Sequence, residues 1–177
     1  LTSAYSVFFY GGTKAESLAI LKVEDNDGKV LEEITPKKGK KVLSPEEAYI
    51  ISNILSDNSA RTDAFGPNSL LNVSGRQIAV KTGTTNDKRD NWTIGWSTQA
   101  VVGVWVGNND NSPMKDVASG VTGASPIWRK IMLSAWERYK GSDFNPPGNV
   151  EARQVDTVSG YPEHDGYQSR ADYFVKG

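Results

Sequence analysis

Three apolar runs in the middle of the chain constrain its fold more than any other feature of the sequence. The second run, residues 92–97, alternates large apolar side chains with small or polar ones, which is typical of a strand with one apolar face. The third run, residues 100–106, carries valines on one face and Val101 and Trp105 on the other, so both faces are expected to be buried. The short link 97–99 predicts that these two runs form an antiparallel hairpin. The first run, residues 76–82, is expected to be a third strand.

A helix is expected before these strands. Ser44 at the N-cap, Pro45 at the first helical position and Glu47 three residues after the cap form a capping box, so local chemistry fixes where the helix begins. The apolar stripe that is expected to face the core consists of Ala48, Ile50, Ile51, Ile54 and Leu55.

A second long helix is expected after the strands. Ser125 and Pro126 are expected to cap it, and Gly141 to end it. The face that should lie across the sheet consists of Trp128, Ile131, Met132, Ala135, Trp136 and Tyr139. Strands joined by short turns, with helices before and after them, predict an α+β fold in which an antiparallel sheet is flanked by helices.

The two ends of the chain differ from this central part. Residues 1–10 are typical of a helix that stops at two glycines, and residues 17–23 and 29–35 predict a hairpin across an Asp-Gly turn. After a proline-rich break the sequence becomes polar and loses any clear period. We therefore expect a domain over residues 1–144 and an extended or partly disordered tail or linker over residues 145–177.

Composition excludes several classes of function. The 20 basic and 21 acidic residues are interspersed and give a net charge of −1, so no nucleic-acid surface is expected. The lysines within residues 37–41 are interpreted as a solvated loop. Cysteine is absent, and the single histidine, His164, lies in the polar tail, which argues against thiol nucleophiles, histidine-based metal sites and Ser-His-Asp triads. No long apolar run is present, so no membrane contact is expected from this segment.

Lys81, Thr82, Gly83 and Thr84 are the main candidates for chemistry. They continue the first apolar run, and on an exposed strand edge a cation and two hydroxyl groups can bind a carboxylate. Glycine has no side chain, so a substrate backbone can approach it closely. These four residues therefore predict a site for a substrate that carries a carboxylate.

The triplet Lys81-Thr82-Gly83 is the K-T-G motif of penicillin-binding proteins and class A β-lactamases. A wider set of segments, in the same order along the chain, resembles the second half of a class A penicillin-binding protein transpeptidase domain. The segments that carry this resemblance are residues 1–5, 11–12, 27–31, 44–49, 76–85, 104–108 and 124–128. Together they extend from Leu1 to about Phe144, and they imply the C-terminal half of that domain's fold.

This resemblance implies a serine D,D-transpeptidase that cross-links peptidoglycan stem peptides, is acylated by β-lactam antibiotics and needs no metal or other cofactor. It implies catalytic roles for Lys81, which would act on the neighbouring catalytic hydroxyl, and for Thr84, whose backbone N–H would form half of the oxyanion hole. Lys81, Thr82, Gly83 and Thr84 would bind the substrate. The whole protein would lie on the extracytoplasmic face of a bacterial membrane, anchored by an N-terminal segment.

The resemblance also places a Ser-x-x-Lys nucleophile motif and a Ser-x-Asn motif upstream, in a half of the domain that would be the partner of this segment. The segment alone is therefore expected to be inactive. Two look-alike motifs are rejected on their context. Residues 112–115 read Ser-x-x-Lys but follow the K-T-G strand in a polar turn, and residues 56–58 read Ser-Asp-Asn at the expected end of a helix.

Other interpretations stay open. A class A β-lactamase-like hydrolase would share the fold and the K-T-G motif, but it would need a carboxylate positioned for deacylation. A non-enzymatic module that binds a cell-wall peptide or a partner would need no nucleophile. The segment from Asp87 to Asp90 is interpreted as a solvated loop at the rim of the site. Trp92, Trp96 and Trp105 are interpreted as core or groove wall rather than as a sugar-stacking surface.

Overall fold

The computed structural model describes residues 1–37, 39–115 and 122–177, so Lys38 of the basic segment lies outside the described residues. The helices in these ranges are α1 (Thr2–Phe9), α2 (Pro45–Ser56), α3 (Asn58–Phe65), the 3₁₀ turn η1 (Asn86–Lys88) and α4 (Ala124–Tyr139). The strands are β1 (Thr13–Lys14), β2 (Lys22–Glu24), β3 (Val30–Glu33), β4 (Lys40–Lys41), β5 (Ala79–Thr84), β6 (Asp90–Trp96), β7 (Val101–Gly107), β8 (Val150–Asp156) and β9 (Ser169–Val175). All strand pairs are antiparallel, which confirms the predicted α+β fold.

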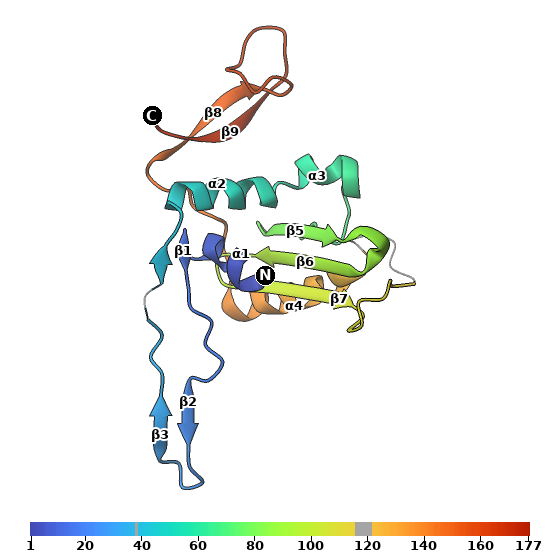
Figure 1. Ribbon diagram of the computed structural model, residues 1–177. Coiled ribbons are helices and arrows are strands. Elements are labelled where there is room, and N and C mark those ends of the chain that lie inside the picture. The colour runs from blue at the N-terminus through green and yellow to red at the C-terminus, as the bar shows by residue number, and fades with distance from the viewer. Residues whose placement is uncertain (38, 116–121) are drawn as a thin grey trace.

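The centre of the molecule is the three-stranded sheet β5-β6-β7, with β6 in the middle (Figure 1). Its register places Thr84 opposite Asn91 and Trp92 opposite Trp105. Directly opposed residues of an antiparallel pair point to the same face, so this register divides the sheet into two faces. α4 packs against one face through β6 and β7, whereas α1 contacts the same two strands and α2 contacts β5.

The main hydrophobic core lies between the sheet and α4. Its buried members are Leu71, Val73, Ile78, Val80, Val102, Val104, Ala124, Trp128 and Met132. At Gly95 of β6 the helix and the sheet come close together, because a Cβ there would lie 2.5 Å from a ring carbon of Trp128. A side chain at this position would therefore push α4 away from the strand.

α4 differs from the sequence-based expectation at its start and along its face. It begins at Ala124 after Gly123, and Ser125 does not cap it but is buried against the Thr93 hydroxyl of β6 at 2.8 Å. The buried positions follow a four-residue spacing along one ridge, so Ile131 and Tyr139, both of which were expected to be covered, are about half exposed. The helix ends at Tyr139, and Lys140 adopts the left-handed conformation, one residue before the expected glycine.

α2 begins as predicted but turns a different face to the core. Ser44 Oγ accepts a hydrogen bond from the Glu47 N–H, and Glu47 Oε2 accepts one from the Ser44 N–H, which confirms the capping box. The residues that α2 buries are Ala48, Tyr49 and Ser52. The expected stripe is therefore wrong at Ile54, which is 56% exposed. The reason is a polar requirement of the core, because Ser52 faces the indole of the buried Trp96.

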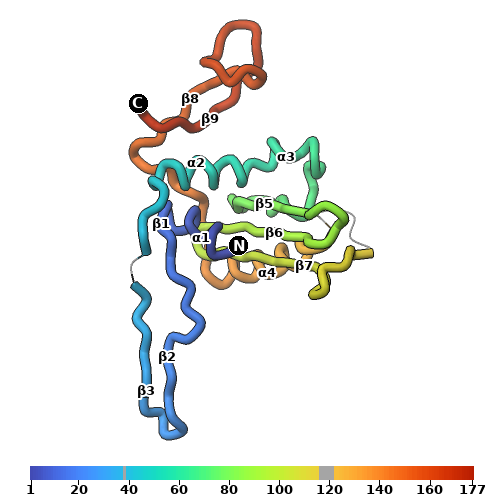
Figure 2. The backbone as a smooth tube through the Cα atoms, in the orientation of Figure 1, coloured from blue at the N-terminus to red at the C-terminus, as the bar shows by residue number. Residues whose placement is uncertain are grey.

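Within the expected tail, β8 and β9 pair into a hairpin that the sequence did not predict (Figure 1). The hairpin has its own buried positions at Val150 and Val155, and Tyr173 packs edge-on against Tyr49 of α2 at 5.4 Å. The C-terminus lies at the hairpin's open end, whereas the N-terminus lies beside the central sheet (Figure 2). The domain boundary near residue 144 stays a prediction.

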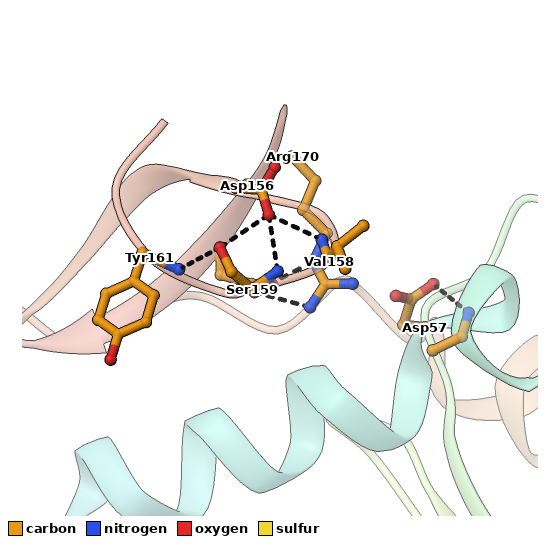
Figure 3. A network of polar contacts seen from close by, with 8 residues as sticks. Asp57, Asp156, Val158, Ser159, Tyr161 and Arg170 are labelled. Carbon is orange, nitrogen blue, oxygen red and sulfur yellow. Dashed lines mark hydrogen bonds and ion pairs between the residues drawn. The ribbon is translucent and has the colours of Figure 1, made fainter. Parts of the chain in front are cut away.

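Asp156 shapes the connection at the far end of this hairpin (Figure 3). Its Oδ1 accepts hydrogen bonds from the Val158 N–H, the Ser159 N–H and the Ser159 hydroxyl. These bonds, with the Ser159 backbone first and a smaller contribution from the charge of His164, hold the pKa of the Asp156 carboxyl below its usual value. An ionised carboxylate thus organises the turn that sequence periodicity did not reveal.

The β2–β3 hairpin projects away from the rest of the molecule on the side opposite to β8–β9 (Figure 1). Its turn is closed by Asp25, whose side chain accepts hydrogen bonds from the N–H groups of Asp27 and Lys29, and Gly28 has a φ of 80°. All four residues of β3 are exposed. The hairpin was predicted, but its strands are shorter than expected, and most of their residues are exposed.

Candidate functional site

The four candidate residues lie together on β5, an edge strand of the central sheet. Lys81, Gly83 and Thr84 are exposed and Thr82 is half-buried. Within the described ranges β5 pairs only with β6, so the backbone groups along its other edge face outward. An extended peptide could therefore add to this edge and find the candidate side chains beside it.

Side-chain direction separates the lysine from the two threonines. Thr82 and Thr84 lie opposite Thr93 and Asn91, on the face of the sheet that α4 covers. Lys81 lies opposite Ile94, on the other face. In this arrangement the Lys81 ammonium donates a hydrogen bond to the Thr82 carbonyl at 2.7 Å. The strand therefore presents a cation on one side of its edge and hydroxyl groups on the other.

Thr84 has a buried neighbour that sequence reasoning missed. Asn91 of β6 is fully buried, and its Nδ2 donates a hydrogen bond to the Thr84 hydroxyl at 3.0 Å. The signal was present in the spacing, because a tight connection between Thr85 and Asp90 fixes the register that sets Asn91 opposite Thr84. Counting outward from that turn would have found it.

A small pocket of about 210 Å³ opens beside Lys81 and Thr82 on the α2–α3 side of the strand. Its wall is mostly apolar and includes Ile54, Phe65 and Leu71. Arg61 of α3 also lines it, and its guanidinium donates hydrogen bonds to the Leu55 and Asp57 carbonyls. Burial lowers the pKa of this guanidinium, while the charge of Asp57 acts in the opposite direction. A second cation thus lies near the start of the candidate strand, and no sequence pattern pointed to it.

The turn that follows the candidate strand is held by side chains rather than by a regular hairpin loop. The Thr85 hydroxyl accepts a hydrogen bond from the Asp90 N–H at 2.8 Å, and Asp87 and Lys88 both have positive φ. Asp90 also accepts from the Trp105 indole N–H at 2.8 Å. Asp90 is thus a half-buried first residue of β6 rather than part of a solvated loop, and it joins the turn after β5 to β7.

The three tryptophans of the sheet have different surroundings. Trp96 is fully buried and stacks on Phe8 at 5.4 Å, and Trp92 is half-buried. Trp105 is 39% exposed, so the expectation that both faces of β7 are buried is wrong at this position. Trp105 lies on the face of β7 that α1 contacts. Among the described elements, α1 covers this face near Gly103, where Thr2 lies against the strand.

The look-alike motifs occupy ordinary structural positions. Ser56 is the last residue of α2 and its hydroxyl donates to the Asn53 carbonyl, while Asp57 caps α3 by accepting from the Ser59 N–H at 2.8 Å. Ser112 lies in a loop, where its N–H donates to Asp110. Neither serine lies at the start of a helix within the described part of the chain.

The remaining candidates are peripheral to this strand. His164 is exposed and packs on the Tyr167 ring at 4.4 Å, in the loop between β8 and β9. Across residues 1–37, 39–115 and 122–177, no three His, Asp or Glu side chains come together in a way that could hold a metal ion. In the same ranges no helix is both long and apolar enough to cross a bilayer.

Comparison with known proteins gives a consistent result. The family described as the penicillin binding protein transpeptidase domain matches residues 1–133. Penicillin-binding protein 1A of Aquifex aeolicus is 34% identical over 154 residues, which are 85% of this chain and 20% of that protein. Penicillin-binding protein 2D of Bacillus subtilis is 31% identical over 183 residues, covering 100% of this chain and 26% of that protein. This chain thus spans about a fifth to a quarter of the length of these curated relatives.

Solved structures share the fold. Penicillin-binding protein 1A from Haemophilus influenzae aligns with a TM-score of 0.83 at 26% identity, over 99% of this chain and 31% of that chain. PonA1 from Mycobacterium tuberculosis in complex with penicillin V aligns with a TM-score of 0.64 at 23% identity, over 91% of this chain and 42% of that chain. The first alignment includes the β8–β9 hairpin, since it covers nearly the whole chain.

Proposed function

Because this chain belongs to the penicillin-binding protein transpeptidase family, we propose that it supplies the substrate-binding strand of a serine D,D-transpeptidase. The reaction would cross-link peptidoglycan stem peptides. A serine would attack the donor peptide before its terminal D-alanine, D-alanine would leave, and an acceptor amine would then take the acyl group. The observation that carries this proposal is the open edge of β5, which presents Lys81, Thr82, Gly83 and Thr84 together.

Each residue of the strand has a proposed role that fits its position. The Thr82 and Thr84 hydroxyls would donate hydrogen bonds to the terminal carboxylate of the stem peptide, and the Thr84 backbone N–H would form half of the oxyanion hole. Lys81 would supply positive potential and act on the catalytic hydroxyl. Gly83 would let the peptide backbone approach, because a Cβ there would meet open space that the substrate would fill.

The nucleophile would come from a segment outside these 177 residues, and that half of the domain would be this chain's main protein partner. The pocket beside Lys81 and Thr82 has an apolar wall, which suits closure by another part of the same domain. β-Lactams would mimic the donor peptide and acylate the same serine. The whole protein would act on the extracytoplasmic face of a bacterial membrane.

Acylation by benzylpenicillin tests the proposal. The intact mass of the isolated chain after incubation with excess benzylpenicillin should be unchanged. A chimera that joins this chain to the upstream part of the H. influenzae penicillin-binding protein 1A transpeptidase domain should gain one adduct, mapped to a serine of the upstream part. In that chimera Lys81→Met should greatly slow acylation, whereas Lys130→Met, which changes an exposed lysine on α4, should not.

Three outcomes would contradict the proposal. An adduct on Ser56 or Ser112 of the isolated chain would mean that a complete site lies within it. Acylation of the chimera that is indifferent to Lys81→Met would remove the role of the strand. Rapid hydrolysis of the adduct would instead indicate a β-lactamase-like hydrolase, and binding of stem peptide without any acylation would indicate a non-enzymatic module.

A further inference from the structure

The side-chain amide of Asn91 joins the candidate binding strand to the start of α4. Its Nδ2 donates a hydrogen bond to the Thr84 hydroxyl at 3.0 Å, and its Oδ1 accepts one from the Ala124 N–H at 2.7 Å. Asn91 is 0% exposed, so its bond to the Ala124 N–H is buried, whereas its bond to the exposed Thr84 is partly buried. A continuous chain of hydrogen bonds thus runs from the first residue of the helix to a hydroxyl on the open edge of β5.

The partner of Oδ1 fixes which way this amide points. A backbone N–H can only donate, so the atom that faces Ala124 must be the amide oxygen. The amide nitrogen then faces Thr84 and donates to it. The Thr84 hydroxyl has a single proton, and because its oxygen receives this bond, the proton is left to point away from Asn91.

We propose that Asn91 is a positioning residue that directs the Thr84 hydroxyl proton outward, toward the carboxylate of a bound peptide. The inference rests on the proposed function, because it assumes that Thr84 faces a carboxylate. Asn91 would not touch the substrate. It would act by keeping Thr84 a donor, and donors to a charged carboxylate are the stronger kind of hydrogen bond.

Two features of the fold support this role. Gly123 leaves the room that Asn91 needs, because a Cβ at Gly123 would lie 2.4 Å from Asn91 Oδ1. α4 has no side-chain cap of its own at Gly123, so the Asn91 oxygen satisfies one of the free N–H groups at the helix start. Successive hydrogen bonds also polarise one another, so the Ala124 bond makes the Asn91 nitrogen a better donor to Thr84.

A purely structural role for Asn91 predicts a different ranking of variants. Asn91→Asp keeps the size of the side chain and its acceptor for Ala124, and a carboxylate at a helix N-terminus is favourable. It would, however, present an acceptor to Thr84, so the Thr84 proton would turn inward. Asn91→Ala removes both contacts but leaves the hydroxyl free to rotate. If Asn91 only holds the fold together, the alanine variant should be the more harmful; if it sets the proton, the aspartate variant should be.

The first measurement needs no ligand. In side-chain ¹H–¹⁵N spectra of the chain, the Asn91 Nδ2 protons should exchange with water slowly. Thr84→Val should shift them and speed their exchange by about tenfold, the factor that one hydrogen bond represents. Unchanged resonances in Thr84→Val would overturn the inference, because the bond that carries it would not exist in solution.

The second measurement compares two peptides by titration of the same chain: N-acetyl-D-alanyl-D-alanine and its C-terminal amide. Wild-type chain should prefer the carboxylate. Asn91→Asp should lower that preference by about tenfold or more, and Asn91→Ala by less, since a bond to a charged group is lost and an acceptor is introduced. In a Thr84→Val background Asn91→Asp should cause no further change, because the two residues act as one unit.

Thr93→Val is the matched control. Thr93 is also fully buried on β6 and also joins the strand to α4, through Ser125, but it lies opposite Thr82 rather than Thr84. It should loosen the contact with the helix while leaving the carboxylate-to-amide ratio unchanged. An equal loss of preference in Thr93→Val and Asn91→Asp would overturn the inference. A wild-type chain without carboxylate preference would refute the proposed function instead, and the ligand-free spectra would still decide whether Asn91 donates a hydrogen bond to Thr84.

Discussion

The indole Nε1 of Trp96 donates a hydrogen bond to the Ser52 hydroxyl across 3.0 Å, and both residues are almost completely buried. The Ser52 hydroxyl in turn donates to the Ala48 carbonyl at 2.8 Å, so its proton and its acceptor site are both used. This pair joins the middle strand of the sheet to α2. It also explains why a serine occupies a face of the helix where sequence reasoning expected isoleucine.

Ser52→Ala should destabilise the chain more than its size suggests. The substitution leaves the Trp96 N–H buried without a partner, which costs about 1–3 kcal/mol in the free energy of unfolding. Urea unfolding followed by tryptophan fluorescence measures this change. Ser59→Ala, at an exposed position of α3, is the control and should have little effect. Equal stability of the two variants would show that the indole finds another partner or water.

Gly95→Ala should separate α4 from the sheet. Its Cβ would lie 2.5 Å from the Trp128 ring and 2.7 Å from the Ala79 carbonyl oxygen, and such overpacking costs roughly 1–3 kcal/mol. Gly83→Ala is a matched control on the neighbouring strand, because a Cβ there meets nothing within 4 Å in the free chain. Thermal unfolding of both variants should show a lowered midpoint only for Gly95→Ala. A normal midpoint for Gly95→Ala would mean that the Trp128 ring can move aside.

The capping box of α2 should stabilise the chain in a pH-dependent way. Hydrogen bonds from the Ser44 backbone N–H, and then from its side chain, hold the pKa of Glu47 below its usual value of 4.5. A lowered folded-state pKa means that the stabilisation is complete above pH 4.5 and is lost as the pH falls through the lowered value. The stability difference between wild type and Glu47→Gln, whose side chain cannot ionise, should therefore be constant near neutral pH and shrink in acid. A difference that does not vary with pH would contradict this account.

Tyr173→Ala should release the β8–β9 hairpin from α2. Burial, followed by the contact with Tyr173, raises the pKa of the Tyr49 hydroxyl above its usual value of 10.0. This contribution to stability is present below pH 10 and is lost as the pH rises through the raised value. Tyr173→Ala should bring the Tyr49 pKa back toward 10, which absorbance titration of tyrosinate measures. Limited proteolysis should also cut faster near residues 145–149, and Tyr167→Ala, in the exposed loop, is the control.

The elements that local chemistry specifies could be predicted from the sequence. The capping box at Ser44 and the Asp-Gly turn at residues 27–28 each carry their instructions within a few residues. The hairpin of β6 and β7 followed from a short link between two apolar runs. The candidate residues on β5 came from a motif, and the structure places all four on one open edge.

The features that depend on tertiary contacts could not be predicted in the same way. Which face α2 buries was decided by the hydrogen-bonding need of Trp96, a residue 44 positions away. The start of α4 was decided by Asn91, which takes the place of a local cap, so Ser125 was assigned the wrong role. The β8–β9 hairpin was missed because a single carboxylate, Asp156, organises a polar sequence that has no apolar period.

The pairing of β1 with β4 has a practical consequence for the projecting β2–β3 hairpin. Thr13 lies opposite Lys41 and Lys14 opposite Lys40, so the two ends of the projecting segment are already side by side at the surface of the body. A segment that leaves and returns at one point, and whose strand β3 is exposed at all four residues, is a natural grafting site. A fluorophore, an epitope or a second small domain inserted at the Asp27-Gly28 tip would sit well away from β5 and leave its edge open to peptides.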